Sequence, residues 1–442
     1  MKKHLFFLVL AIVMAAVTGL YSQSGCLPDG ITFSSQAQID SFPINYPGCS
    51  VIEGSVIVQE SIDENIISLD SLYSIISIKG DLKIGSSSMK SNFALTSLSG
   101  LKDLTTINGS LFVQGNPSLT NLIGLDNVTF LGDDLIIIGN ESLTNLTGLN
   151  NVLYINGILY VVGNKALTSL DGLDNLTSIG GSISIGGNTI LTNLSGLGNV
   201  TFVGGLLTIA TGNKSLKNLS GLNNVTSIGG LNLNYTSLTS LNGLDNLISI
   251  KDDIRIGGNH MLTSLSGLES LTFVGGSIII GYGEEDGSKS ANPMLMSLNG
   301  LDNLDYTTPG YLQINYNSKL TTCNILPICD YLANGGKADI AKNAPGCNSQ
   351  QEVKDACAVS VDSLMHNDAI QLFPNPTTGI LKINTPDNTE WSVSLLDANG
   401  RLMILSHKLT NGEIDLSNVP TGLYFIELNN GQRSITERII KQ

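Results

Sequence analysis

The sequence predicts an all-β protein, a right-handed β-solenoid followed by a small antiparallel β-sandwich. Three observations lead to this fold class. A leucine-rich phrase of the form LTSLxGL recurs from Leu95 to Leu320. Each repeat also carries a short stretch that alternates apolar and polar residues, such as Ser182–Ile185. After Cys357 the repeat stops, and short alternating runs separated by Asn-Gly and Thr-Gly turns follow. A regular period of this length is typical of solenoids.

The repeat has a period of about 24 residues. Successive phrases start 22 to 25 residues apart, except for one gap of 33 residues. With a weaker start at Ile66, the phrases predict about 10–11 turns. The phrases start at Leu95, Leu119, Leu143, Leu167, Leu191, Leu216, Leu238, Leu262, Leu295 and Leu320.

Two apolar patterns define each turn. Alternation at Ser182–Ile185 predicts a strand with Ile183 and Ile185 facing inward and the serines facing outward. The leucines at the start of each repeat recur every three residues, which suits a coil bending around a core. A helix is not expected within the repeats, because Gly, Asn and Thr interrupt every one of them.

Polar and glycine columns support the stacking. A stacked Asn side chain can bond both its own turn and the next one. A glycine column suits a turn that needs positive φ or close backbone approach. One Asn column is Asn92, Asn116, Asn140, Asn164, Asn188, Asn213, Asn259, Asn292 and Asn317; the other is Asn127, Asn151, Asn175, Asn199, Asn224, Asn246 and Asn303. The glycines are Gly100, Gly124, Gly148, Gly172, Gly196, Gly221, Gly243, Gly267 and Gly300.

The composition narrows the classes of partner. The chain has 442 residues, a formal net charge of −15 and 48 glycines. Its acidity disfavours polyanions, so nucleic acid is not an expected partner. No Cys or His grouping has zinc-site spacing, so neither a metal nor a cofactor is expected.

The N-terminus reads as a secretory signal peptide over residues 1–22. Two lysines precede an apolar run from Leu5 to Val17, and small and polar residues follow. A transmembrane anchor is the alternative, but the run is shorter than a comfortable span. Cys26 is not expected to be a lipoprotein cysteine, because the preceding Gln23-Ser24-Gly25 lacks the apolar residue expected three positions before it.

The six cysteines lie at the two ends of the repeats, which suggests disulfide-stapled caps on an exported chain. Caps would protect the open ends of the solenoid from pairing with other strands. Cys26 and Cys49 form the expected N-terminal pair. The last four cysteines allow three connectivities, among which Cys323–Cys347 with Cys329–Cys357 is preferred.

The segment from Cys26 to Val58 and the repeated LxxLxGLxxLxxIGGxLxI pattern resemble the receptor L-domain family. The resemblance covers roughly residues 26–358 and sets the first domain at 23–358. It implies a single-stranded, leucine-rich, right-handed β-helix whose role is to bind ligands or partners. Because the contact residues of this family vary, none is carried over to this chain.

The C-terminal part, residues 372–442, resembles the sorting domain of type IX secretion cargo, and a linker is expected at 359–371. This resemblance implies a bacterium of the Bacteroidota, recognition by the type IX machinery and delivery to the outer-membrane surface or the medium through the periplasm. It also implies removal of the domain and, for retained cargo, attachment to lipopolysaccharide. The motif residues are Pro374, Asn375, Pro376, Gly379, Asp397, Gly400, Arg401, Gly422, Tyr424 and Lys441.

The outward face of the alternating strand carries the candidate ligand-binding residues. On three adjacent turns it is apolar, whereas its other positions, apart from Ile57 and Ile279, are polar. A contiguous exposed apolar patch predicts a binding surface, with β-propensity or cover by a flanking segment as the alternative. The candidates are Phe112, Ile136, Ile138, Tyr160 and Val162.

These features favour a non-catalytic binding or adhesion scaffold that takes an unknown glycan or protein ligand. Two alternatives stay open, a polysaccharide-acting enzyme and an ice-binding solenoid, the latter because of a Thr column that includes Thr144 and Thr168. The single solenoid histidine, His260, is expected to be a solvated loop residue. Adjacent acids such as Asp133-Asp134 and Asp252-Asp253 read as turn residues, and the inserted acids at 284–286 as a solvated loop rather than a calcium site.

Overall fold

The computed structural model describes residues 25–442, apart from 62–63, 87–91, 284–288, 366–369, 386–389, 398–400, 410–411 and 432–433. The described chain forms two compact units that divide between Lys354 and Asp355. The signal peptide expected at residues 1–22 lies outside the described residues. None of the described helices is long and apolar enough to cross a membrane.

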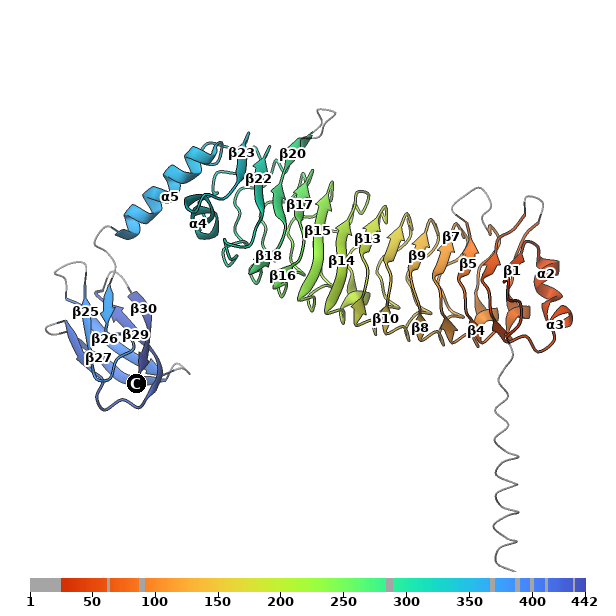
Figure 1. Ribbon diagram of the computed structural model, residues 1–442, viewed down its shortest axis with the longest axis horizontal. Coiled ribbons are helices and arrows are strands. Elements are labelled where there is room, and N and C mark those ends of the chain that lie inside the picture. The colour runs from red at the N-terminus through yellow and green to blue at the C-terminus, as the bar shows by residue number, and fades with distance from the viewer. Residues whose placement is uncertain are drawn as a thin grey trace, which may run out of the picture. The chain divides into compact units, whose positions relative to one another are not determined.

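The first unit is a parallel β-solenoid in which one strand per turn pairs with the same strand of the next turn (Figure 1). It has about 12 turns, more than the 10–11 expected. The added turns lie at the N-terminal end, where β1 and β3 precede the first leucine phrase. This long-strand column consists of β1 (Ile31–Phe33), β3 (Val56–Val58), β5 (Leu82–Gly85), β7 (Leu111–Gln114), β9 (Leu135–Ile138), β11 (Leu159–Val162), β13 (Ile183–Gly186), β14 (Phe202–Ile209), β15 (Ser227–Asn234), β17 (Ile254–Gly257), β19 (Ser277–Ile280), β22 (Tyr311–Asn315) and β23 (Ala338–Ala341).

A second column of two-residue strands precedes the first in each turn. Strands β14 and β15 are long enough to belong to both columns. In three turns the leucine phrase contains a short 3₁₀ helix, namely η1 (Asp70–Leu72), η2 (Ser99–Leu101) and η3 (Ser195–Leu197). This short-strand column contains β2 (Val51–Ile52), β4 (Ser77–Ile78), β6 (Thr106–Ile107), β8 (Phe130–Leu131), β10 (Tyr154–Ile155), β12 (Ser178–Ile179), β16 (Ser249–Ile250) and β18 (Phe273–Val274).

The core is a stack of leucine and isoleucine side chains from every turn. In the turn around β13, Leu167, Leu170 and Leu173 are fully buried, as are Ile183 and Ile185. Each such side chain contributes about 1.5–3 kcal/mol of burial free energy. The three-residue leucine spacing and the strand alternation therefore point to the same interior, as the sequence predicts.

The glycine column marks where successive turns approach most closely. Gly172 has φ +113°, and a Cβ there would lie 2.1 Å from the carbonyl oxygen of Leu146 in the preceding turn. Gly196 sits in the same column within η3 and does not have positive φ, yet its Cβ would lie 1.9 Å from Leu170 O. Both glycines are therefore needed because the backbones of successive turns come too close for a Cβ atom.

The first Asn column forms a buried hydrogen-bond ladder. The Oδ1 of Asn164 accepts from the backbone N–H and the Nδ2 of Asn140, at 3.0 and 3.1 Å. Its Nδ2 donates to Ile137 O at 3.0 Å. Thr236 fills the one gap in the column, where its Oγ1 donates to Asn259 Oδ1. The ladder continues one turn beyond Asn317 to Asn343, a member that the repeat pattern does not include.

Both ends of the solenoid are closed by helices and disulfides. At the N-terminal end lie α2 (Gln36–Asp40) and α3 (Phe42–Asn45), with a disulfide between Cys26 and Cys49. At the other end lie α4 (Leu326–Ala333) and a disulfide between Cys323 and Cys347. Both pairings match those expected, and Cys329 and Cys357 are disulfide-bonded as well. The helices were not expected, because the capping segments lack a long periodic pattern.

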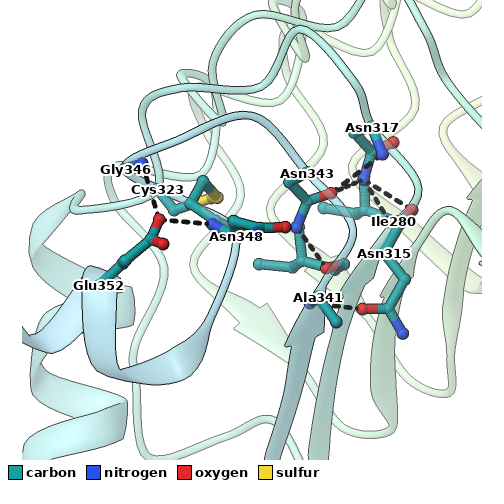
Figure 2. Close-up of a disulfide and its surroundings, with 11 residues drawn as sticks. Ile280, Asn315, Asn317, Cys323, Ala341, Asn343, Gly346, Asn348 and Glu352 are labelled. Atoms are coloured by element: carbon teal, nitrogen blue, oxygen red, sulfur yellow. Dashed lines mark hydrogen bonds between the residues drawn. A yellow bond between two sulfur atoms is a disulfide. The ribbon is translucent and has the colours of Figure 1, made fainter.

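Figure 2 shows how the last turn is held. Asn317 Nδ2 donates to Asn343 Oδ1, and Asn315 Oδ1 accepts from the backbone N–H of Ala341. Glu352 Oε2 accepts from the backbone N–H groups of Gly346 and Asn348, at 2.8 and 3.0 Å. This carboxylate lies in the first turn of α5 (Gln350–Met365), where the helix dipole favours negative charge. Helix α5 covers residues 359–365 of the segment expected as a linker.

The 33-residue gap contains a small hairpin. β20 (Tyr282–Gly283) pairs antiparallel with β21 (Lys289–Ser290). Ser290 is buried, and its Oγ lies 2.7 Å from the hydroxyl of Tyr235 two turns earlier. A Cβ at Gly257 would meet the Tyr282 ring at 2.7 Å, so the hairpin lies over the outward face of the strands beneath it.

The second unit contains two antiparallel sheets around one core. The sheets are ordered β24-β25-β28 and β27-β26-β29-β30. Their strands are β24 (Gln371–Phe373), β25 (Ile380–Asn384), β26 (Ser392–Asp397), β27 (Leu402–Lys408), β28 (Glu413–Asp415), β29 (Gly422–Asn429) and β30 (Ser434–Lys441). Leu381 and Ile414 of the first sheet and Val393, Leu395 and Ile426 of the second share the core. This is the expected sandwich.

Candidate binding face of the solenoid

The five candidate ligand-binding residues lie side by side on the outward face of the long-strand column. Phe112, Ile136 and Tyr160 are direct partners in β7, β9 and β11. Ile138 pairs with Val162 one step along the same strands. All five side chains are half-buried. We call this set the apolar patch; the structure brings it together as one contiguous surface.

The apolar patch has sharp borders along the solenoid. On the N-terminal side, Lys83 places its Nζ 4.9 Å from the centre of the Phe112 ring, a cation–π contact. On the other side, Tyr160 pairs with Ser184 and Val162 pairs with Gly186. The patch therefore covers three turns and ends where the column returns to small polar residues.

On the C-terminal side of the patch the same column is polar from Ser184 to Arg255 and becomes apolar again at Ile279. Ser184, Thr208, Asn232 and Arg255 follow one another in register. The sequence also places Ile279 among the outward, exposed positions, but its side chain is only 8% exposed. Ile279 lies between the long side chains of Arg255 and Gln313, its direct partners in the neighbouring strands. It therefore offers no apolar surface to a ligand.

The short-strand column carries a second apolar surface, which the sequence reasoning missed. Tyr154, Phe202 and Phe273 are exposed on it, and the rings of Phe130 and Tyr154 meet edge to face with centroids 5.9 Å apart. The signal was present, because these residues occupy the position before an inward Ile, Leu or Val in each two-residue strand. A two-residue strand is too short to show alternation, so the pattern of the longer strand does not reveal these residues.

The remaining candidates occupy ordinary structural positions. His260 is exposed in a turn. Asp134 Oδ1 accepts from Ile158 N at 2.8 Å, and Asp253 Oδ1 accepts from Ser277 N at 2.8 Å. Over the described residues, no group of three or more His, Cys, Asp or Glu side chains could hold a metal ion. The acids at 284–286 lie outside the described residues.

The expected sorting residues hold the second unit together. Asn375 bridges to β30 through its side chain, which donates to Arg438 O and accepts from Ile440 N, both at 2.9 Å. The Tyr424 hydroxyl donates to Pro420 O at 2.9 Å. Arg401 N donates to Asp397 Oδ1 at 2.9 Å.

The other sorting residues are found at the surface and at the terminus. Pro374 and Pro376 are exposed beside Asn375, and Gly379 N donates to Thr377 Oγ1. Gly422 begins β29 opposite Lys441, which is buried. Gly400 lies outside the described residues.

These features define a two-part protein, a capped parallel β-solenoid followed by a compact antiparallel β unit at the C-terminus. Residues 371–442 match the family described as the secretion system C-terminal sorting domain. The match indicates export through the type IX secretion system and hence a location outside the cell or on its surface. A comparison with curated proteins finds no match to the chain.

Proposed function

We propose that the exported solenoid is a non-catalytic binding and adhesion scaffold whose apolar patch contacts an extracellular glycan or a protein partner. The observation that carries the proposal is the clustering of Phe112, Ile136 and Tyr160 in register on an outward sheet face. A structural solenoid gains nothing from large apolar groups at such a position. A binding protein gains a flat platform on which a sugar ring or a partner side chain can stack.

Two observations favour binding over the alternatives. The acids that a glycosidase would need are used by the backbone, as the bonds of Asp134 and Asp253 to the next turn show. The threonines that an ice-binding face would need donate to the preceding turn, as Thr144 Oγ1 does to Thr120 O at 3.2 Å. After sorting, retention through surface lipopolysaccharide would hold such a scaffold where its ligand is found.

The test is the double variant Phe112→Ser and Tyr160→Ser. Serine already occupies this column at Ser184, so the stack should tolerate the change and the melting temperature should stay within a few degrees. We expect the variant to lose binding to whole cells and to extracellular polysaccharide, measured by pull-down of the mature protein.

The matched control is Tyr154→Ser with Phe202→Ser, which removes two aromatic rings from the short-strand column. It should leave binding intact. If the control loses binding and the patch variant keeps it, the binding surface is the short-strand column. If the patch variant melts early and still binds, Phe112 and Tyr160 are packing residues and the proposal fails.

A further inference from the structure

A second outward column runs beside the apolar patch, one residue before each long strand, and ties the turns together. Its polar side chains accept a hydrogen bond from the backbone N–H of the next turn. Ser110 N donates to Asp81 Oδ1 at 2.9 Å, and Leu206 N donates to Ser182 Oγ at 2.9 Å. Asp253 Oδ1 accepts from Ser277 N in the same way.

The column has apolar members at Ile158 and Leu206, and at Gly230 of β15 it has no side chain at all. Leu206 of β14 pairs with Gly230, and Gly230 is followed in the column by Asp253. The register shifts here by one residue, because Val203 and Leu206 of β14, three positions apart, pair with Ile228 and Gly230 of β15, two positions apart. Irregularities of this kind are common beside binding sites, where they re-aim side chains. Because this position is Gly230, the column has no side chain in this turn.

Gly230 lines an open hollow of about 320 Å³ on the outward face. Gly230 and Leu231 form its floor, and Leu206 forms one wall. Asn232, Asp252, Asp253 and Arg255 supply its polar groups. The volume lies at the lower end of the range for small-molecule sites, about 300–1,000 Å³, so it suits one small ring rather than a chain.

The walls differ in chemistry. Leu206 is 40% exposed, an apolar surface without cover in the column. Opposite it, Arg255 Nη2 and Asp253 Oδ2 form an ion pair at 3.0 Å, which leaves the other guanidinium N–H groups for a ligand. The carboxylate of Asp252 is exposed at the rim.

The amide groups of β15 add further hydrogen-bonding capacity. Asn234 Nδ2 donates to Asn232 Oδ1, and Asn232 lines the hollow. Asn234 Oδ1 is buried and has no hydrogen-bond partner among the residues that the structure describes. Asn234 itself does not line the hollow, so of the two amides only that of Asn232 can contact a ligand there.

We propose that this hollow binds a single pyranose unit of a neutral saccharide. A sugar ring has an apolar C–H face, which fits Leu206, and an edge of hydroxyl groups, which fits amide, carboxylate and guanidinium. Two carboxylates and one guanidinium give the lining a net charge of −1, which disfavours acidic sugars. The inference rests on the proposed binding function and names its ligand class.

The hollow and the apolar patch lie on the same outward face. Tyr160, Ser184, Thr208 and Asn232 follow one another in register, so the hollow lies three turns from the patch, about 14 Å along the solenoid. One saccharide chain can thus reach both surfaces. The hollow would select one sugar unit, and stacking of another unit on the patch would add contact area.

The test uses the mature full-length protein and ligand-observed NMR with glucose, galactose, mannose and N-acetylglucosamine at millimolar concentration, and glucuronate as the acidic counterpart. Two variants alter the hollow. Leu206→Ser removes the apolar wall and copies Ser182. Gly230→Gln fills the hollow; Gly230 has no positive φ, and its Cβ would meet only the mobile end of Leu206 at under 3 Å.

We expect at least one neutral sugar to bind, and both variants to weaken that binding by about tenfold or more. The control Ile158→Ser makes the same kind of change in the same column two turns before Leu206, and it should bind as the wild type does. If Gly230→Gln does not fold, judged by its melting curve, Leu206→Ser decides the result.

The proposal is overturned if no neutral sugar binds, if glucuronate binds more tightly, or if the hollow variants bind as well as the wild type. These outcomes are separate from the fate of the proposed function. Retained binding of cells with no effect of the hollow variants rejects the hollow alone. If sugars bind at the hollow but the protein binds neither cells nor polysaccharide, the adhesive role is rejected and the proposal for the hollow stands.

Discussion

At the scale of single residues, a buried amide ladder fixes the register of the turns. Asn116, Asn140, Asn164 and Asn188 are completely buried, and each bonds to the following turn. Burial without partners would be costly, so these bonds hold one register and reject others. At the N-terminal end the ladder closes with Glu60, whose carboxylate accepts from the backbone N–H groups of Ile66 and Phe93.

Replacing one ladder residue should destabilise the solenoid strongly. In Asn164→Ala, the N–H of Asn140 and the carbonyl of Ile137 lose their partners inside the stack. We expect a loss of about 2–3 kcal/mol in unfolding free energy, measured by denaturant titration. Asn175→Ala is the control, because Asn175 is exposed and its Nδ2 makes one bond to Asn150 O. Equal losses in the two variants would contradict the special role of the buried column.

Asp253 should make a pH-dependent contribution to stability. The backbone N–H of Ser277 holds its pKa below the usual value, with help from the Arg255 side chain, while partial burial opposes the shift. A lowered folded-state pKa means stability that is present above the unfolded pKa of about 3.9 and is lost as the pH falls through the folded value. Melting temperatures from pH 6 to pH 2 should show Asp253→Asn converging with the wild type at low pH. A constant difference would contradict this.

At the scale of elements, the caps differ from the repeats in what stabilises them. The repeats gain from stacked leucines and amide ladders, whereas the caps combine short helices with disulfides. Phe42 of α3 is fully buried against Phe33 of β1, with ring centroids 5.6 Å apart. The Cys26–Cys49 disulfide then closes a loop of 23 residues around this small apolar cluster.

Cys26→Ser should weaken the N-terminal cap. Loss of this disulfide is expected to cost about 2–4 kcal/mol, because the unfolded cap regains the freedom of the open loop. Hydrogen exchange should show the loss concentrated in β1 and β3, while β13 stays protected. Cys323→Ser should show the mirror pattern, with the loss near β22 and β23. Free thiols at both Cys26 and Cys49 in the native exported protein would contradict the assignment.

At the scale of the whole molecule, the sorting domain and the surface proposed to bind a ligand belong to different units. The solenoid presents long outward faces with an apolar patch and a polar hollow, and the C-terminal unit carries the sorting signal. The buried motif residue Tyr424 and the bridging Asn375 keep that unit folded, while Pro374 and Pro376 are exposed beside them. Export and binding should therefore be separable by deletion and by surface substitution.

Deletion of residues 371–442 should trap the solenoid in the periplasm of a host with type IX secretion. Cell fractionation with an antibody against the solenoid measures the outcome. The solenoid variant Phe112→Ser with Tyr160→Ser serves as the control, because it leaves the sorting domain intact and should reach the surface or the medium normally. Normal delivery of the truncated chain would refute the role of the sorting domain.

Local patterns in the sequence predict the period, the inward residues and the order of the two units. Leucines every three residues and alternation at positions such as Ser182–Ile185 are local patterns, and burial of one face follows directly from them. The apolar patch could also be placed, because register in a parallel solenoid follows from the repeat length. The sorting domain can be predicted from the sequence for a different reason, because its motifs occur in order along the whole C-terminal unit.

Features that depend on neighbouring turns cannot be predicted from one repeat and emerge when the turns stack. Ile279 and Ile136 have the same local pattern, yet Ile136 is half-buried whereas Ile279 is only 8% exposed. The helices of the caps cover the open ends of the stack. They lie outside the repeats, so the repeat pattern does not predict them. The hollow is lined by residues of three successive turns, among them Leu206, Gly230 and Asp253, next to a one-residue register shift between β14 and β15. Contacts between turns, rather than patterns within one, determine these features.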